Sequence, residues 1–444
     1  MKQRTRIISR RRFLQQSGAV AGAIAVPMIV PASVFGAEPP SERITVGCIG
    51  TGRMGQGDMR DLLRFPQAQI VAVCDVDSKR AKDAQKIVVD HYSRQTETAW
   101  TGCETYGDFR DVTSREDIDA VMIATPDHWH ALPAIAAAKA GKDIFLQKPL
   151  TLTIREGRVL SNTVRRYDRV FQVGSQQRSD EKFRLACEWV RNGRIGKVHT
   201  IKVGFGTDPG CEPQPEMPVP PNLDYNMWLG QAPLAPYTEW RVHPQKAYGR
   251  PGWLRISAYG HGMITGWGSH HLDIAQWGLG TELSGPVAVE GEAVFPKEGL
   301  WDVHGDFRIE YTYADGVKVI AADTGTHRHK QGVVFEGADG WVYVRRGFLD
   351  AEPKSLLQER IGPDGIQLYR SNDHKRNWLE CIRSRRPTVA PVEVGHRSCT
   401  MCLLGSIAMR LGRKLRWDPE KEEFIDDAAA NHMRSRSMRA PWTL

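Results

Sequence analysis

The stretch Ile44-Thr-Val-Gly-Cys-Ile-Gly-Thr-Gly-Arg-Met-Gly55 decides the fold of this chain. A short apolar run, of the length of a buried strand, ends in a turn that carries Gly50, Gly52 and Gly55 in the order G-x-G-x-x-G. In a dinucleotide-binding fold the first glycine makes the tight turn and the second lets a pyrophosphate approach the backbone. The third lets the following helix pack closely on the strand. The phosphates would bind the free N–H groups at the start of that helix.

A second apolar run strengthens this interpretation, because a glycine turn alone is a weak signal. The run 70–74 ends at Asp75, 25 residues after Gly50, about where a dinucleotide fold places the carboxylate that binds the ribose 2′-hydroxyl. Asp75 favours NAD, since a carboxylate there would repel a 2′-phosphate, whereas Arg53 and Lys79 leave NADP open. The predicted contacts with the cofactor in this region are Gly50, Thr51, Gly52, Arg53, Met54, Gly55 and Asp75.

Length and charge limit the class of protein. With 444 residues the chain is long enough for two domains with their own cores. The net charge of +8 includes six Lys and Arg residues, and no acid, within residues 1–36, so that +2 remains without them. The basic character therefore gives no argument for nucleic acid binding, and we expect no nucleic acid partner.

The N-terminal segment has the pattern of an export signal. Residues 9–15 read Ser-Arg-Arg-Arg-Phe-Leu-Gln, and a weakly apolar stretch follows over residues 18–34. The segment resembles a twin-arginine signal with Arg10 and Arg11 as the pair. Two prolines in the apolar stretch make a membrane anchor the less favoured alternative. We predict that residues 1–37 are the signal, that the protein is periplasmic or otherwise exported, and that it keeps no stable membrane span after export.

Polar clusters follow two further predicted strands. The run 120–124 leads into Thr125-Pro-Asp-His-Trp-His130, and the run 143–146 leads into Gln147-Lys-Pro149. Strands that alternate with helices predict a parallel sheet, in which ligands bind at the carboxyl ends of the strands. Lys148 could reach a cofactor ribose and a substrate hydroxyl, and burial beside an oxidised nicotinamide would lower its pKa towards that of a proton shuttle. A solvated loop lysine is an equally weighted alternative.

The block Gly266-Trp-Gly-Ser-His-His-Leu-Asp-Ile-Ala-Gln-Trp277 carries the second candidate chemistry. We expect Ser269 to cap a helix, which would place His270 and Asp273 on one face. A carboxylate three residues from a histidine can fix its tautomer for acid/base work. A metal site is the minority interpretation because a further nearby carboxylate is missing, and we predict none.

Residues 223–253 contain an unusual density of aromatic and polar side chains, Trp240 and Arg241 among them. Aromatic faces beside hydrogen-bond donors suit carbohydrate rings. A small core beneath a loop is the alternative. The eight cysteines are scattered, and we interpret them as buried free thiols, including the pair Cys399 and Cys402.

Three of these blocks together carry a resemblance to a known family. Gly50–Gly55, Thr125–His130 and Gln147–Pro149 match, in order and spacing, blocks of the Gfo/Idh/MocA oxidoreductases, and the resemblance runs from about residue 43 to the C-terminus. It implies an α/β Rossmann dinucleotide-binding domain (residues 42–165) and then an α+β domain with a large, mostly antiparallel open sheet (residues 166–444). It also implies that the C-terminal helices pack back on the first domain and that the protein is a homo-oligomer, a dimer or tetramer.

The resemblance also implies roles for individual residues, carried over position by position. Predicted cofactor contacts are Thr125, Pro126, His128, His130, Gln147, Lys148 and Gln176; predicted substrate contacts are Arg178, Trp240, Arg241 and His271; predicted catalytic residues are Lys148, His270 and Asp273. The chain departs from the family pattern at two positions. Gln147 replaces the usual glutamate, and Gly266 replaces the usual aspartate four residues before the histidine. The second departure puts the proton path in doubt, with His271 or Asp273 as candidates to compensate.

We therefore expect an exported oxidoreductase that uses tightly bound NAD, with NADP not excluded, to interconvert a secondary alcohol and a ketone on a sugar, glycoside or polyol. Two alternatives stay open at this point. One is a glycoside hydrolase or lyase that acts through transient oxidation and returns NAD unchanged. The other is a sugar-binding relative without catalysis, to which Gly266 and Gln147 give weight.

Overall fold

The computed structural model describes residues 43–325 and 330–444. The predicted export signal, residues 1–37, lies outside the described residues. Residues 43–444 form one compact unit.

A six-stranded parallel sheet forms the first part of this unit, with the strand order β3-β2-β1-β4-β5-β6. Its strands are β1 (Ile44–Ile49), β2 (Ala68–Cys74), β3 (Glu104–Tyr106), β4 (Ala120–Ile123), β5 (Asp143–Leu146) and β6 (Phe171–Val173). The helices that follow them are α2 (Arg53–Leu62), α3 (Ser78–Thr96), α4 (Phe109–Ser114), η3 (Asp127–Trp129), α5 (Ala131–Lys139), α6 (Ile154–Arg166) and η4 (Gln176–Ser179). This is the strand order of the Rossmann fold, whose direction reverses between β1 and β4.

Local sequence explains these elements. All four residues of β4 and of β5 are buried; β4 is a continuous apolar run, and β5 is apolar after Asp143, whose carboxylate accepts a bond from the N–H of Val170. Helix α3 begins where the Asp77 carboxylate accepts bonds from two backbone N–H groups. Helix α6 begins with a capping box, in which Thr153 and Glu156 each accept a bond from the other's backbone N–H.

A nine-stranded sheet forms the second part, with the order β13-β12-β11-β7-β10-β9-β8-β14-β15. Its strands are β7 (Val198–Phe205), β8 (Ala288–Ala293), β9 (Phe307–Thr312), β10 (Lys318–Asp323), β11 (Gly332–Gly337), β12 (Gly340–Arg345), β13 (Phe348–Glu352), β14 (Leu415–Asp418) and β15 (Glu423–Phe424). The pair β7 and β10 is parallel and the other pairs are antiparallel. The predicted fold class, a Rossmann domain followed by a large and mostly antiparallel sheet, is confirmed.

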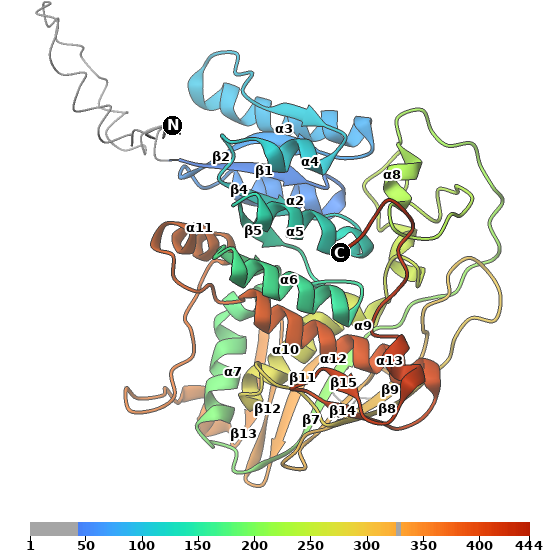
Figure 1. The fold of residues 1–444 in the computed structure, drawn as a ribbon. Helices are drawn as coiled ribbons and strands as arrows, with labels where there is room; N and C mark the ends of the chain where they lie inside the picture. The colour runs from blue at the N-terminus through green and yellow to red at the C-terminus, as the bar shows by residue number, and fades with distance from the viewer. Residues whose placement is uncertain (1–42, 326–329) are drawn as a thin grey trace, which may run out of the picture. The chain divides into compact units, whose positions relative to one another are not determined.

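Helices cover one face of this second sheet (Figure 1). The helices of the later chain are α7 (Glu181–Arg191), α8 (Tyr225–Leu229), η5 (Gly252–Arg255), α9 (Met263–Gly266), α10 (Gly268–Leu279), η6 (Lys354–Gln358), α11 (His374–Ser384), α12 (Val392–Leu411) and α13 (Ala428–His432). Of these, α12 packs on β8 and on α6, whereas α11 contributes Trp378 and Leu379 to the core around β1 and β5. The last two helices of ten or more residues thus tie the second sheet to the Rossmann sheet.

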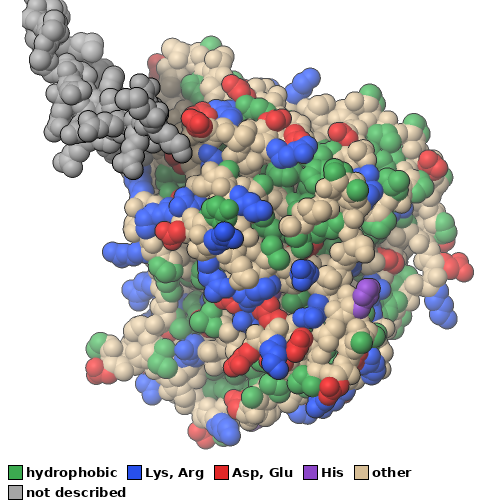
Figure 2. Space-filling model, in the orientation of Figure 1, with side chains coloured by type: hydrophobic (Ala, Val, Ile, Leu, Met, Phe, Trp, Pro, Cys, Tyr) green, Lys and Arg blue, Asp and Glu red, His purple; other side chains and the backbone are tan. Residues whose placement is uncertain are grey.

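On the face drawn in Figure 2, basic and acidic side chains are interspersed. No helix of the described ranges is long and apolar enough to cross a membrane. The eight cysteines are free, and all but Cys211 are buried, which agrees with their interpretation as structural thiols.

Candidate active site

A cleft opens at the carboxyl ends of β1, β2, β4 and β5, beside the reversal in strand order. Its lining includes Gly50, Gly52, Arg53, Met54, Asp75, Thr125, Pro126, Asp127, His130, Gln147 and Lys148 from the first sheet, and His243, Arg250, Trp253, Gly266 and Trp267 from later segments. Three blocks that are separated by up to about a hundred residues in the sequence therefore meet in one place. Ligands of open α/β sheets bind at such a position.

The glycine turn has the shape that a pyrophosphate requires. Gly50 has a φ of +83°, and a Cβ on this residue would lie 2.7 Å from the backbone of Thr125. A Cβ on Gly55 would lie 2.0 Å from the carbonyl oxygen of Gly50. Helix α2 follows Gly52 without a side-chain cap, so its first N–H groups are free to bind phosphate oxygens. The residues present therefore fit a dinucleotide.

Asp75 is held in the cleft by the turn itself. Its Oδ2 accepts bonds from the N–H of Thr51 at 2.8 Å and from the Thr51 hydroxyl at 3.1 Å. Its Oδ1 accepts a bond from the N–H of Asp77 at 3.0 Å. Oδ1 accepts only one of these bonds and keeps a second lone pair, so Asp75 can still accept a bond from a ribose hydroxyl.

The loops after β4 and β5 are joined by His130. Its ring nitrogens lie 2.6 Å from the carbonyl oxygen of Pro149 and 3.0 Å from that of Thr125. The peptide between Lys148 and Pro149 is cis. Because His130 connects both loops, the position of Lys148 depends on the Thr125–His130 block.

His128 does not line this cleft, in contrast to its predicted contact with the cofactor. Its side chain is 1% exposed, and Nε2 lies 3.0 Å from the carbonyl oxygen of Trp228. The ring packs against Trp228 and Tyr259. In the short 3₁₀ turn η3, neighbouring residues point to different sides, so Asp127 faces the cleft and His128 faces away from it.

Gln147 has a structural reason to replace glutamate. Its Nε2 donates a bond of 2.8 Å to Oδ2 of Asp58, and Nζ of Lys375 lies 2.9 Å from Oδ1 of the same carboxylate. All three side chains are buried. A glutamate at position 147 would set a second carboxylate against Asp58, whereas the amide supplies a donor. Gln147 still lines the cleft.

Lys148 and Asp127 both line the cleft and interact electrostatically. Nζ of Lys148 donates a bond of 3.1 Å to the carbonyl oxygen of Gly266, at the position where the family pattern has aspartate. Burial lowers the pKa of Lys148, while the charge of Asp127 opposes this shift. Burial raises the pKa of Asp127 to about 7, and the charge of Lys148 offsets part of the rise. The sequence prediction missed Asp127, although it lies directly after β4 in a block already singled out.

Asp273 does not support His270, and this part of the prediction is wrong. Its carboxylate accepts two bonds from the guanidinium of Arg178, at 2.7 and 2.9 Å, and one of 2.6 Å from the hydroxyl of Ser398. Arg178 is 2% exposed and, in this buried pair, is not available to a substrate. The helix does not begin at Ser269 either: Ser269 lies inside α10 and its hydroxyl donates to the carbonyl of Thr265.

His270 and His271 contact Trp267, which lines the cleft. Three of their ring nitrogens have no hydrogen-bond partner in the described part of the chain. Among the described residues, Nδ1 of His270 and both ring nitrogens of His271 are buried and unpartnered. The ring of His271 stacks on Trp267, with centroids 5.4 Å apart, and His270 meets the same indole edge-on. Burial, then the charge of Lys148, lowers the pKa of His270, so its imidazole is neutral. Its unpartnered Nδ1 is open to a hydrogen bond, although the lowered pKa makes the ring a weak base.

The remaining predicted substrate contacts lie away from this cleft. Trp240 is 49% exposed and Nε of Arg241 bonds the carbonyl oxygen of Pro236 at 3.0 Å; neither residue lines the cleft. Gln176 lies in η4 and does not line it. Most aromatic side chains of residues 223–253 form a small core, which was the alternative interpretation, although Trp228 and Trp253 also reach the cleft.

Two sequence models of one protein family match the chain. Residues 44–175 match "Oxidoreductase family, NAD-binding Rossmann fold", and residues 195–444 match "Oxidoreductase family, C-terminal alpha/beta domain". The chain therefore has an NAD-binding Rossmann domain.

Similar proteins include an uncharacterized oxidoreductase, YrbE, of Bacillus subtilis, which is 31% identical over 42% of this chain and 48% of its own length. A glycosyl hydrolase family 109 protein of Shewanella pealeana is 29% identical over 43% of this chain and 44% of its length. The alignments thus span about half the length of these relatives. The WlbA dehydrogenase of Bordetella pertussis, solved with NADH and UDP-GlcNAcA, has a TM-score of 0.61 at 16% identity and covers 85% of this chain and 99% of its own. By its two family domains, this chain belongs to the Gfo/Idh/MocA oxidoreductase family.

Proposed function

We propose that this oxidoreductase interconverts a secondary alcohol and a ketone on a sugar, glycoside or polyol, with NAD as the cofactor. The observation that carries the proposal is the place of Lys148. Its amino group lies in the same cleft as the glycine turn and Asp75, and it is bonded to Gly266 from the second part of the chain. The similarity to dehydrogenases that were solved with a sugar nucleotide supports the substrate class.

Bound NAD supplies the acceptor for the hydride that leaves the substrate carbon. The protein supplies positions and a route for the proton. The N–H groups at the start of α2 hold phosphate, Asp75 holds ribose hydroxyls, and Nζ of Lys148 binds the reacting hydroxyl. Because the pKa of Lys148 is lowered, its neutral amine is accessible and can take the hydroxyl proton at Nζ.

Asp127 and His270 are the two groups that can pass this proton on. Asp127 lines the cleft and has a pKa of about 7, so its carboxyl changes charge near neutral pH. Neutral His270 lies behind Trp267 and can accept a proton at an unpartnered nitrogen. We propose that Asp127 serves in place of the aspartate that position 266 lacks, and that His270 is the next group of the relay.

The test is a spectrum of the purified protein, with bound NAD, before and after mixing with a panel of glycosides and polyols. We expect the absorbance band of reduced nicotinamide to rise with one substrate class, and the rise to disappear in Lys148→Met at unchanged NAD affinity. A protein that binds NAD and sugars but never reduces the cofactor would support the non-catalytic alternative instead.

A glycosidase that uses NAD without net redox change is the second candidate function, because a glycosyl hydrolase family 109 protein is among the similar sequences. The Lys148 site would serve it equally, since transient oxidation begins with the same proton transfer. Release of an aglycone with no change in the oxidation state of NAD would identify this activity. Net reduction of NAD without aglycone release would exclude it.

We also propose that the protein is exported as a folded oligomer and keeps its cofactor tightly bound, because no dependable nicotinamide pool exists outside the cytoplasm. The twin arginines Arg10 and Arg11 are the support for export. Fractionation of cells that express the chain and its Arg10→Lys/Arg11→Lys variant tests the route. Purified protein that is free of dinucleotide and binds it only weakly would contradict tight retention.

A further inference from the structure

Arg346 occupies a constrained position at the tip of a hairpin. Strands β12 and β13 remain paired up to Arg345 and Phe348, so only Arg346 and Gly347 form the turn. Gly347 has a φ of +75°, which lets the chain reverse directly after Arg346. A two-residue turn between paired strands leaves the backbone of Arg346 little freedom.

The guanidinium of Arg346 lies over Trp267, a residue that lines the cleft, although Arg346 is not itself one of the lining residues. Its Cζ is 4.7 Å from the centroid of the Trp267 ring, and Trp267 lines the cleft beside Lys148 and Gly266. The same indole stacks on His271. A cation over an indole is held in place, and its N–H groups at the ring edge stay free for another partner.

No acidic side chain of the described residues forms an ion pair with Arg346. Asp180 acts on it electrostatically, but the carboxylate of Asp180 caps α7 through the N–H of Lys182, at 2.9 Å. The other ionisable groups that its charge affects are Lys148, His270 and His271. After burial, the largest cause, the positive charge of Arg346 contributes to the lowered pKa of His271, and with that of Lys148 to the lowered pKa of His270. Arg346 is therefore an exposed guanidinium without an ion-pair partner among the described residues, and the charge of Lys148 repels it.

We propose that Arg346 binds an anionic group of the substrate, a carboxylate or a phosphate, on the Trp267 side of Lys148. This inference rests on the proposed function and narrows its substrate class to acidic sugars. The planar guanidinium offers two parallel N–H bonds to such a group, which the neutral histidines and Trp267 cannot supply.

The phosphates of the cofactor are the competing anion, and the arrangement disfavours them. The pyrophosphate site is formed by the glycine turn and the start of α2, with Arg53 beside it. Arg346 comes from the second sheet and influences Lys148, His270 and His271, which surround the place of the reacting carbon rather than the glycine turn.

The test compares methyl β-D-glucuronide, methyl β-D-glucoside and glucose 6-phosphate as substrates of the NAD-bound enzyme. We expect the wild-type enzyme to prefer one of the two anionic sugars over the glucoside. Which of the two it prefers shows whether the site binds a carboxylate or a phosphate. In Arg346→Gln we expect KM for that anion to rise about 10- to 100-fold, the usual effect of losing a charge-assisted bond, with kcat/KM for the glucoside within about threefold. Arg345→Gln is the matched control, because its guanidinium lies over Phe348, and it should leave all three substrates unchanged.

Three results would overturn the proposal. They are a wild-type enzyme that prefers the glucoside to both anions, an equal loss for charged and neutral substrates in Arg346→Gln, and a fall in NAD affinity in that variant. Calorimetric binding of methyl β-D-glucuronide and glucose 6-phosphate to the two proteins separates this inference from the proposed function. An Arg346-dependent affinity for either anion supports the site even if no sugar reduces NAD, whereas equal affinities contradict it even if turnover is found.

Discussion

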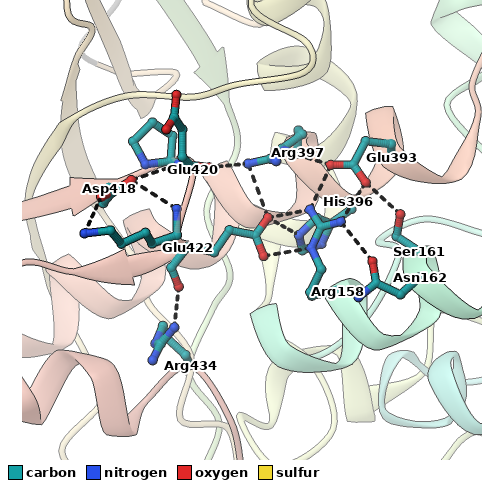
Figure 3. Close-up of polar contacts among 12 residues, drawn as sticks. Arg158, Ser161, Asn162, Glu393, His396, Arg397, Asp418, Glu420, Glu422 and Arg434 are labelled. Carbon is teal, nitrogen blue, oxygen red and sulfur yellow. Dashed lines mark hydrogen bonds and ion pairs between the residues drawn. The ribbon is translucent and has the colours of Figure 1, made fainter.

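Two regions of the protein differ in how completely their polar side chains are hydrogen-bonded. Between α6, α12 and the β14–β15 hairpin, Arg158 binds both carboxylate oxygens of Glu393 and both of Glu422, at 2.6 to 3.0 Å (Figure 3). His396 contacts Glu422 at 2.7 Å, and Arg397 contacts Glu393 at 2.9 Å. Two cations therefore face two anions in this network, which we call the Arg158 network.

The cleft presents the opposite picture. Thr125 Oγ1, His270 Nδ1 and both ring nitrogens of His271 are buried without partners among the described residues, and Lys148 has a single bond to a carbonyl oxygen. A buried polar group without a partner costs free energy, so such groups persist where a ligand completes them. In these two regions, full pairing accompanies the contacts that hold elements together, and incomplete pairing accompanies the groups that we propose bind and react; unpartnered buried atoms also occur elsewhere in the described ranges, as at Gln177 and Tyr311.

Lys148→Met changes the cleft, and its effect on kcat should be the largest of the predicted effects. We expect kcat for the sugar substrate to fall about 10²- to 10⁴-fold, because the proton acceptor at the reacting hydroxyl is lost. The free energy of unfolding should not decrease, since the replaced amine is a poorly solvated cation with one hydrogen bond. Stopped-flow reduction of NAD and urea unfolding measure the two quantities. A variant that unfolds more easily but keeps its rate would reverse the assignment.

Arg158→Met removes the central cation of the Arg158 network and should affect stability rather than activity. Removing Arg158 from this half-buried network leaves the carboxylates of Glu393 and Glu422 facing each other, and we expect a loss of about 1–3 kcal/mol in the free energy of unfolding. Arg165→Met is the matched control: its side chain is 59% exposed and lies 3.9 Å from Glu393, so its loss should stay below about 0.5 kcal/mol. Urea unfolding tests both. Activity per folded molecule should not change, and a large fall in kcat with Arg158→Met would contradict the division between the regions.

Gln147→Glu tests a hydrogen-bonded pair at the edge of the cleft, Gln147 and Asp58. The new carboxylate would face Asp58 at the present distance of 2.8 Å, and we expect a loss of about 1–3 kcal/mol in unfolding free energy. Asp58→Asn in the same chain should recover part of this loss, because the amide then supplies the donor. Thermal unfolding of the single and double variants gives the coupling free energy. Additive effects would show that the two side chains do not interact.

Much of the fold could be predicted because its signals are local. The glycine turn, the apolar runs of β1, β4 and β5 and the polar residues directly after them are contiguous in the sequence. The position of Lys148 in the cleft followed from the same rule, that parallel strands collect ligands at their carboxyl ends.

The errors concern contacts between distant segments. The spacing of His270 and Asp273 was compatible with a pair, but Arg178 is 95 residues away from Asp273 and binds it more completely than a histidine could. Spacing on one helix cannot reveal a competing partner from another element. Likewise, Trp240 and Arg241 were chosen by composition, which does not show whether an aromatic residue lines a cleft, joins a core or, like Trp240, lies on the surface.

The smallest expected effect concerns the pH dependence of stability, which should have opposite signs in the two regions. Burial raises the pKa of Asp127 to about 7, so the folded, cofactor-free protein resists an ionisation that the unfolded chain undergoes freely above about pH 4. The stability that Asp127 contributes is present below pH 4 and is lost as the pH rises to 7.

Asp127→Asn should therefore raise the unfolding free energy by about 1–2 kcal/mol at pH 8 relative to its effect at pH 4, while lowering activity. For Glu422 burial acts against ionisation, but bonds from His396 and Arg158 outweigh it and lower the pKa to about 2. Its contribution is present above about pH 4.5 and is lost as the pH falls towards 2, so Glu422→Gln should cost most at neutral pH. Melting temperatures of both variants between about pH 2 and pH 8 test the contrast, because the window of Glu422 lies below pH 4.5 and that of Asp127 between pH 4 and pH 7. Parallel profiles would mean that the Asp127 carboxyl is not held neutral by its surroundings, and would remove it from the proposed relay.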